Sequence, residues 1–356
     1  MVTRREVALL GLAAMGSIRA TRAAALGAGG PQGDGSPNDP LRDVDPELRA
    51  FLRTLPPETP INADVVKSWR QTPDLISEKD LPAGVMARTI QGSPGGKDVR
   101  IYIIGANGGT RSRPALLYMH GGGFISGNTA SSWPKFSGLQ KLAQEHDCLI
   151  VSVDYRLAPE TPFPGALEDS YAALKWLRAN AGLLGADAGR ILIMGESAGG
   201  GLAATLAIAA RDRGEVPVRF QLLIYPMLDD RTGSTREPAP QIGNFIWTRQ
   251  SNRFGWTSLL GMPAGSPSVP YGSVPARVDD LRGLPPTYMA VGALDLFVDE
   301  DIAYARRLVD AGVPTEFYLA PGAYHGFFFL APDAAISKKF EASFQAALAK
   351  AFASTA

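Results

Sequence analysis

A Gly-x-Ser-x-Gly run at 195–199 places Ser197 between a strand predicted over 191–194 and an alanine-rich helix predicted over 198–211. In such an elbow the serine sits on a sharp, strained turn, and its hydroxyl projects out of the fold. The helix behind it offers free N–H groups to developing negative charge. Small residues are needed at 195 and 199, because the strand and helix backbones approach too closely there for side chains. The run therefore predicts Ser197 as a nucleophile for acyl transfer.

A serine hydroxyl needs a base to attack at neutral pH, and the chain holds only three histidines. His146 lies at the polar end of a helix and is predicted to be exposed. His120 precedes the serine and opens a run of glycines. His325 follows the last predicted strand, and it alone satisfies the chain order serine, acid, histidine that such elbows use. We therefore expect His325 to be the general base.

The third member of the site should orient the imidazole and stabilise its protonated form. It should lie between the serine and the histidine, at the carboxyl end of a strand. Asp295 meets both conditions, because it leaves the strand predicted over 287–291. Three further acids at 299–301 compete for this role. They fit better as the acidic first turn of the next helix, where one of them could also contact the site.

A glycine run at 121–123 follows the strand predicted over 115–119 and supplies the fourth element. A tetrahedral intermediate needs N–H donors aimed at its oxyanion, and bare backbone can approach a substrate closely. The expected donors are the N–H groups of Gly122, Gly123 and Ala198, supported by His120, Gly121 and Glu196. A phosphate loop would need a Walker lysine or a Gly-x-Gly-x-x-Gly spacing, and neither is present. No Cys/His cluster has metal-ligand spacing, so we expect no metal site.

Short apolar segments that alternate with helical stretches must position these residues. Strands are predicted over 85–90, 99–104, 115–119, 149–153, 191–194, 220–225, 287–291 and 315–319, and helices over 163–181, 198–211 and 299–311. Phenylalanine and leucine repeat every four residues from 340 to 352, which indicates a packing face on the last helix. The middle strands are apolar throughout, as expected for parallel strands covered on both faces. The pattern predicts an α/β fold with an eight-stranded, mostly parallel, doubly wound sheet.

Two stretches interrupt the alternation: residues 46–80 before the first strand, and an insertion at 229–284 that carries Trp247 and Trp256. An insertion at the carboxyl edge of a parallel sheet lies where ligands bind in such folds. We therefore expect 46–80 to be an N-terminal cap segment and 229–284 a cap insertion within a catalytic domain at 81–356. The alternative is that the aromatic residues only stabilise a surface subdomain.

The first residues resemble an export signal. A twin arginine at 4–5, an apolar stretch at 7–18 and three alanines at 23–25 are followed by a linker-like composition up to 45. We expect an export signal over 1–25 and a flexible linker over 26–45, hence a periplasmic or secreted protein. A disordered terminus on a cytoplasmic protein is the alternative. The apolar stretch is too short for a stable membrane anchor.

Composition and charge bear on the partners of the protein and on the state of its cysteine. The chain has 356 residues, a formal net charge of zero and one cysteine, Cys148. Without a long basic run, nothing indicates a nucleic-acid partner. The single cysteine rules out an internal disulfide, and its place at the head of a strand predicts a buried, inert thiol.

These motifs together resemble the bacterial hormone-sensitive lipase group of α/β-hydrolase carboxylesterases, from about residue 82 to the C-terminus. The run at 120–124 is similar to that family's oxyanion motif, and 195–200 to its nucleophile elbow. Residues 154–160 and 162–164 are similar to its hallmark loop. The segments around Asp295 and His325 are similar to its acid and histidine blocks. Glu196 departs from the pattern, since many relatives carry aspartate there, and the export-like N-terminus is unusual.

The resemblance implies an α/β-hydrolase fold with a helical cap, a triad of Ser197, Asp295 and His325, and no cofactor. We therefore expect a serine carboxylesterase that acts on small esters with short to medium acyl chains, as a monomer or homodimer. Amide, lactone or carbamate hydrolysis by the same triad stays open. A ligand-binding receptor is a further alternative, since plant gibberellin receptors resemble this family. Those receptors lack the catalytic histidine, so the presence of His325 counts against it.

Overall fold

The computed structural model describes residues 39–55, 61–70, 80–93, 96–106, 112–132 and 135–353. Within them, eight strands form one sheet in the order β1-β2-β4-β3-β5-β6-β7-β8. The pairs β1–β2 and β2–β4 are antiparallel, and the remaining pairs from β4 to β8 are parallel. The strands are β1 (Val85–Ile90), β2 (Val99–Ile104), β3 (Arg113–Met119), β4 (Leu149–Asp154), β5 (Ala186–Glu196), β6 (Phe220–Ile224), β7 (Thr287–Gly292) and β8 (Thr315–Ala320).

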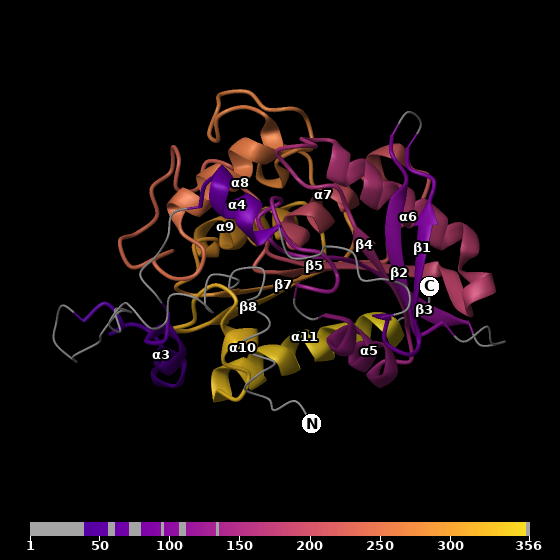
Figure 1. Ribbon diagram of the computed structural model, residues 1–356, viewed down its shortest axis with the longest axis horizontal. Helices are drawn as coiled ribbons and strands as arrows, with labels where there is room; N and C mark the ends of the chain where they lie inside the picture. The colour runs from indigo at the N-terminus through magenta and orange to yellow at the C-terminus, as the bar shows by residue number, and fades with distance from the viewer. Residues whose placement is uncertain are drawn as a thin grey trace.

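Helices cover both faces of this sheet. In Figure 1, α5, α10 and α11 lie on one side of the strands, and α6, α7 and α9 lie on the other, with α4 and α8 beyond α9. The helices are α3 (Pro46–Leu52), α4 (Ala63–Trp69), α5 (Lys135–Glu145), α6 (Gly165–Asn180), α7 (Ala198–Arg213), α8 (Arg249–Leu260), α9 (Val298–Asp310), α10 (Phe327–Leu330) and α11 (Ala335–Ala353), with short 3-10 turns η2 (Gly182–Leu184) and η3 (Pro275–Arg277). The doubly wound α/β-hydrolase architecture predicted from the sequence is therefore confirmed.

Successive side chains of the central strands enter two separate hydrophobic cores. On β3, Leu117 and Met119 join the core that includes residues of α6 and α7. Leu116 and Tyr118, on the opposite face, join the core that includes residues of α5 and α11. This period of two is the geometry of a strand, and burial on both faces explains why β3 contains no exposed residue.

All eight predicted strands are present, and the differences lie at their ends. β5 begins at Ala186, well before the predicted start at 191, because residues 187–190 are partly buried or exposed and give no apolar signal. β6 ends at Ile224 rather than 225, since Tyr225 has a positive φ of 34° and leaves the strand. The predicted helix at 163–181 begins instead at Gly165, after Pro164.

Residues 39–45 fall within the predicted flexible linker, and the structure differs from that expectation. Leu41 and Val44 are 0% and 2% exposed and belong to the core that also contains α3 and α11 residues. The N–H of Asp45 donates to the carbonyl oxygen of Gly322, 2.9 Å away. The chain is therefore packed from residue 39. The rest of the predicted linker and the export signal over 1–25 lie outside the described residues and stay predictions.

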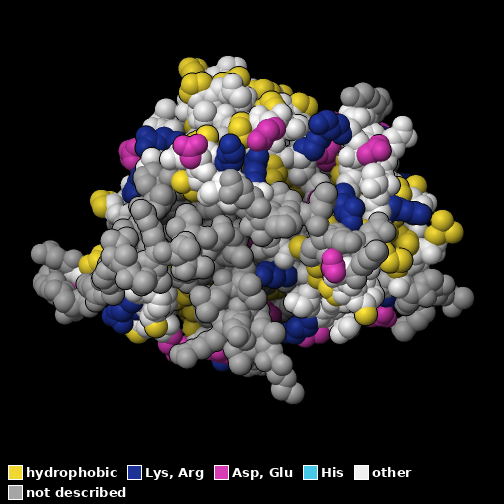
Figure 2. Space-filling view, viewed as in Figure 1, with side chains coloured by type: hydrophobic (Ala, Val, Ile, Leu, Met, Phe, Trp, Pro, Cys, Tyr) yellow, Lys and Arg dark blue, Asp and Glu magenta, His cyan; other side chains and the backbone are white. Residues whose placement is uncertain are grey.

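Three further observations concern the surface charges, the hydropathy of the helices and the lone cysteine. Basic and acidic side chains are interspersed on the face shown in Figure 2. Among the residues that the structure describes, no helix is both long and apolar enough to cross a bilayer. Cys148 is fully buried, which confirms the prediction of a buried thiol, and burial raises the pKa of this thiol to about 12.

The phenylalanine stripe of α11 is a packing face, and a substitution at Phe344 tests its contribution to stability. Its side chain is 1% exposed, and its ring packs against those of Phe328 and Phe340. Phe344→Ala should lower the free energy of unfolding by about 3–5 kcal/mol, since it removes a buried ring and leaves a cavity. Urea denaturation measures this. Leu183→Ala, at a side chain 80% exposed, should change it by less than about 0.5 kcal/mol. Equal losses in the two variants would contradict the packing.

Candidate active site

The turn between β5 and α7 holds Ser197 in a strained conformation. Its φ is 56° and its ψ is −124°, in the half of backbone space that side chains disfavour. A Cβ added to Gly195 would lie 2.1 Å from the carbonyl oxygen of Gly199, and one added to Gly199 would lie 2.2 Å from that of Met119. Both positions therefore need glycine, for the steric reason that the sequence indicated.

Backbone hydrogen bonds tie this turn to the neighbouring strand. The N–H of Ser197 donates to the carbonyl oxygen of Ile224 at 2.9 Å, and its own carbonyl accepts the N–H of Met227 at 3.0 Å. The end of β6 thus supports the turn from the side. The Ser197 side chain lies at the carboxyl end of the parallel strands, where ligands bind in such sheets.

Three predicted residues meet at this edge in a chain of hydrogen bonds. His325, in the loop after β8, places its Nε2 3.0 Å from Ser197 Oγ. Its Nδ1 lies 2.8 Å from Asp295 Oδ2, in the loop after β7. A carboxylate only accepts, so Nδ1 carries the proton and Nε2 is free to accept the serine hydroxyl. Asp295 Oδ1 accepts the N–H of Phe297, which fixes the carboxylate.

Aromatic rings enclose the imidazole of His325. Tyr225 and Phe297 meet it edge to face at centroid distances of 4.6 and 5.3 Å, and Trp247 lies at 6.4 Å. The His325 and Ser197 side chains are largely buried, and Asp295 is fully buried. The hydrogen bonds of this chain therefore act in a low-dielectric environment, where they are stronger than in water.

The glycine run after β3 packs directly on the serine turn. A Cβ on Gly121 would lie 3.0 Å from the carbonyl oxygen of Glu196. Gly122 and Gly123 have positive φ values of 122° and 63°. Their N–H groups make no hydrogen bond within the part of the chain that the structure describes. The N–H of Ala198 opens helix α7, where the first N–H groups have no intrahelical partner. Three unbonded donors are thus available close to Ser197.

Glu196 joins the serine turn to the glycine run. Its Oε1 accepts the N–H of Gly121 at 2.7 Å, and Tyr118 Oη lies 2.7 Å from both of its carboxyl oxygens. The side chain is buried, and burial raises its pKa to about 8, against the opposing effect of these donors. A largely protonated acid can still accept from Gly121 and donate to the tyrosine.

His120 also supports the glycine run from within. Its ring stacks on that of Tyr155 at 4.2 Å, and its Nδ1 lies 2.8 Å from the carbonyl oxygen of Gly121. The side chain is fully buried, and burial lowers its pKa, so the ring is neutral and donates through Nδ1. It is not hydrogen-bonded to Ser197. His146 lies elsewhere; it is partly buried, not exposed as predicted, and bonds Gln345.

The three competing acids divide in a way that the sequence did not indicate. Asp299 is exposed on the first turn of α9, as expected. Glu300 is buried and accepts the N–H groups of Leu228 and Asp229, which holds the loop after β6. Asp301 is fully buried, and its carboxyl oxygens have no partner among the described residues; burial raises its pKa well above its ordinary value. The helical periodicity of the apolar residues in α9 could have indicated this division, because it places Glu300 and Asp301 on the buried side of the helix.

Two arginines that the sequence did not single out as site residues hold the surrounding loops. Arg70, which ends α4, donates to the carbonyl oxygens of Ile125 and Ala158 and pairs with Glu160 at 2.6 Å. It therefore ties the N-terminal segment to the residues that follow the glycine run and to the loop after β4. Arg156 in that loop donates from Nε and Nη2 to the carboxyl oxygens of the fully buried Asp169, and its backbone N–H donates to Oδ2 of the same residue. No local sequence signal marks Arg70, since its partners lie 55 or more residues away.

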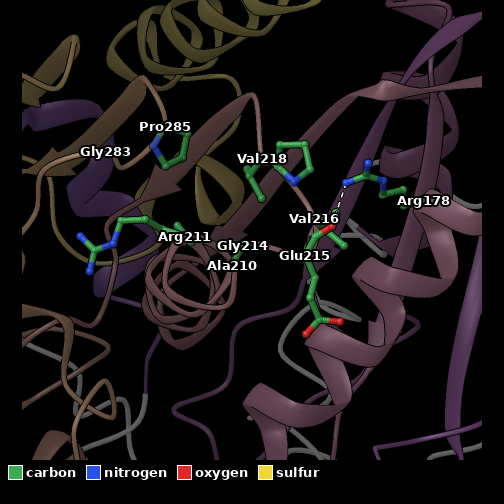
Figure 3. Close-up of a pocket in the computed structure, with 11 residues that line it drawn as sticks. Arg178, Ala210, Arg211, Gly214, Glu215, Val216, Val218, Gly283 and Pro285 are labelled. Carbon is green, nitrogen blue, oxygen red and sulfur yellow. Dashed lines mark hydrogen bonds between the residues drawn. The ribbon is translucent and has the colours of Figure 1, made fainter.

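A pocket of about 460 Å³ lies away from this site. Figure 3 shows its lining, with Arg178 hydrogen-bonded to the backbone of Glu215. Val218 and Pro285 in its wall precede β6 and β7, so the pocket lies at the amino ends of these strands. None of its residues is a predicted site residue. Among the described residues, no cluster of His, Cys, Asp and Glu could hold a metal ion.

Comparisons with known proteins agree with this arrangement. A family model described as the alpha/beta hydrolase fold matches residues 116–329. Esterase LipI of Mycobacterium tuberculosis is 34% identical over 80% of this chain and 88% of its own length. Ethyl acetate hydrolase of Pseudomonas putida is 33% identical over 64% of this chain and 70% of its own. The structure titled bacterial heroin esterase superposes with a TM-score of 0.77 at 38% identity, covering 88% of this chain and 99% of that one.

The fold, the serine turn and these similarities define a class of protein. The chain belongs to the α/β-hydrolase fold family, within the bacterial carboxylesterases related to hormone-sensitive lipase. As a member of that group it is a carboxylesterase enzyme. The resemblance seen in the sequence motifs is thereby confirmed.

The buried carboxyl of Glu196 predicts a specific pH dependence of stability. Its pKa rises from an ordinary 4.5 to about 8 on folding, so the folded state keeps a proton that the unfolded state loses. Wild type should therefore lose stability, relative to Glu196→Gln, by up to about 1.4 kcal/mol per pH unit. The loss runs from about pH 4.5 to 8 and then stops. Denaturant unfolding of both proteins from pH 4 to 9 measures it.

The control for this experiment is Glu316→Gln, which removes a carboxyl from an exposed position of β8. Its unfolding free energy should run parallel to that of wild type. Glutamine at 196 can still accept the N–H of Gly121 and donate to Tyr118, so the geometry is kept. A parallel curve for Glu196→Gln as well would show that folding leaves the pKa of this carboxyl unchanged.

Proposed function

We propose that the protein hydrolyses small carboxylic esters with short to medium acyl chains, through a catalytic triad of Ser197, His325 and Asp295. One observation carries the proposal: the continuous hydrogen-bonded chain from Ser197 Oγ through the imidazole to Asp295 Oδ2, at 3.0 and 2.8 Å. It has the geometry required of a nucleophile, a general base and an orienting acid.

In the first half of the reaction, Ser197 Oγ attacks the ester carbonyl while His325 Nε2 takes the hydroxyl proton. The carbonyl oxygen becomes an oxyanion, and the N–H groups of Gly122, Gly123 and Ala198 stabilise it. Asp295 stabilises the imidazolium that forms without itself being protonated. His325 then gives its proton to the alcohol oxygen, the ester bond breaks, and the acyl group stays on Ser197.

In the second half, water takes the place of the alcohol. His325 removes a proton from the water, whose oxygen attacks the acyl-enzyme carbonyl and forms a second oxyanion. Collapse of this intermediate returns the proton to Ser197 Oγ and releases the acid. The same donors serve both oxyanions, and the reaction balances without a cofactor.

The preference for short acyl chains is supported by similarity. Ethyl acetate hydrolase of Pseudomonas putida, one of the relatives, is named for an ester with a short acyl chain. Amides, lactones and carbamates undergo acyl transfer through the same groups, so only matched substrates distinguish them from esters. The distinction rests on the leaving group, whose departure the triad must assist by protonation.

Removing the nucleophile or the acid tests the triad. Ser197→Ala should reduce kcat by at least about 10⁵-fold, because no oxygen remains to carry the acyl group. Asp295→Asn should reduce it by about 10⁴-fold, because the amide favours the wrong imidazole tautomer. Asp299→Asn, at the exposed acid of α9, is the matched control and should retain wild-type kcat. An active Ser197→Ala enzyme would overturn the proposal.

A substrate series tests the acyl preference. Hydrolysis of p-nitrophenyl esters from acetate to palmitate should be fastest at the short end, and p-nitroacetanilide should be cleaved far more slowly than p-nitrophenyl acetate. Initial rates with wild type and with Ser197→Ala separate enzymatic from spontaneous hydrolysis. Fastest cleavage of palmitate, or of the anilide, would replace the proposed substrate class with a lipase or an amidase.

A further inference from the structure

One segment of the chain, residues 243–256, touches all three loops of the candidate site; we call it the strap. The N–H of Gly243 donates to the carbonyl oxygen of Leu294 at 3.0 Å, beside the acid. The ring of Phe245 lies 6.1 Å from that of Tyr324, beside the histidine. Trp247 packs on the glycine run. The strap is therefore placed to shape the space in which a substrate would react.

Trp247 is held rigidly within the strap. Its side chain is 3% exposed, and its Nε1 donates to Asn252 Oδ1 at 3.1 Å. The fully buried Asn252 in turn donates through Nδ2 to the carbonyl oxygen of Thr232 at 2.8 Å. Ile246, immediately before it, has a φ of 68°, which is a strained conformation for a β-branched residue. Strain of this kind persists where the surrounding structure requires it, and it clusters at functional sites.

The indole of Trp247 lies next to Gly123 of the glycine run and next to the imidazole of His325. A Cβ on Gly123 would lie 2.2 Å from Trp247 Cη2, so the indole covers this glycine closely. The same ring lies 6.4 Å from the ring of His325, tilted by 38°. Gly255 allows the approach, since a Cβ there would lie 2.8 Å from the carbonyl oxygen of Gly123. The indole therefore borders both groups at once.

The geometry of a tetrahedral intermediate decides which part of the substrate meets this ring. The carbon carries four groups: Ser197 Oγ, the oxyanion, the alcohol oxygen and the acyl chain. The oxyanion must face the N–H groups of the glycine run. The alcohol oxygen must lie within hydrogen-bond reach of His325 Nε2, which protonates it. A side chain that borders both Gly123 and His325 is therefore on the alcohol side, and the acyl chain extends away from it.

We infer that Trp247 limits the alcohol part of the substrate, so that the enzyme favours esters of small, unbranched alcohols over esters of bulky ones. This inference rests on the proposed function, because it presumes hydrolysis by the triad. The position of the indole is fixed, because its Nε1 donates to Asn252, a buried residue of helix α8. Selectivity is therefore built into the strap and acts independently of the acyl preference.

Three substrates distinguish an effect on the alcohol part from an effect on the acyl part: ethyl acetate, cyclohexyl acetate and ethyl hexanoate. In Trp247→Ala, the kcat/KM ratio of cyclohexyl acetate to ethyl acetate should rise by about 10-fold or more over wild type, the range that pocket contacts provide. The ratio of ethyl hexanoate to ethyl acetate should change by less than about 2-fold. A general loss of activity, for example from a less rigid glycine run, lowers kcat/KM for every substrate and therefore leaves these ratios unchanged.

The matched control exchanges the other tryptophan of the strap. Trp256 is fully buried against Phe124, and its Nε1 has no hydrogen-bond partner in the described parts of the chain. Trp256→Phe should leave both ratios at wild-type values, whereas Trp247→Phe should raise the cyclohexyl ratio to a value between those of wild type and Trp247→Ala. The Phe variants keep a packed ring and so test the inference even if Trp247→Ala fails to fold.

The outcomes are distinguishable. A rise in the cyclohexyl ratio confined to the Trp247 variants supports the inference. Unchanged ratios, or a change only in the hexanoate ratio, would overturn it while leaving ester hydrolysis intact. If folded wild type cleaves none of the three esters and none of the p-nitrophenyl series, the proposed function itself fails.

Discussion

The backbone of Ser197 can lie between β5 and α7 only in a conformation that almost no other part of a protein adopts. Its φ of 56° and ψ of −124° turn the chain so sharply that Gly195 and Gly199 nearly touch. The strain is balanced by a parallel sheet whose strands are buried on both faces and by backbone hydrogen bonds to the end of β6. In return, the serine hydroxyl and the first N–H of a helix face the same small space.

The glycine run that would receive the oxyanion is supported from several sides. The buried Glu196 accepts its first N–H, and the neutral ring of His120 donates to its carbonyl. Arg70, from the N-terminal segment, donates to the carbonyl oxygen of Ile125 just after it, and Trp247 covers it from the strap. Loops with positive φ at consecutive residues are flexible unless held, and hydrolysis needs donors already in place. The cost of burying so many polar groups is offset by their mutual hydrogen bonds.

Much of this architecture was readable from short-range patterns. Apolar segments separated by helical stretches predicted all eight strands, and the signal was clearest in the central ones, because burial on both faces of a parallel sheet imposes a recognisable composition. The ends of β5 and α6 were less accurate, since partly buried residues and prolines weaken that signal. Chain order chose His325 among three histidines, and the structure brings it to Ser197. Exposure of His146 was predicted wrongly, because α11 packs beside it at Gln345.

The sequence by itself determined the elements whose requirements are local: a glycine-flanked serine, a glycine run, and acid and histidine placed after strands. Local steric demands leave their mark on neighbouring residues, so they can be read along the chain. Tertiary structure alone decided that Glu300 holds a loop, that Arg70 bonds the chain just after the glycine run, and that the indole of Trp247 borders both Gly123 and His325. These contacts join segments far apart in sequence, and only the packing of the sheet, helices and strap brings them together.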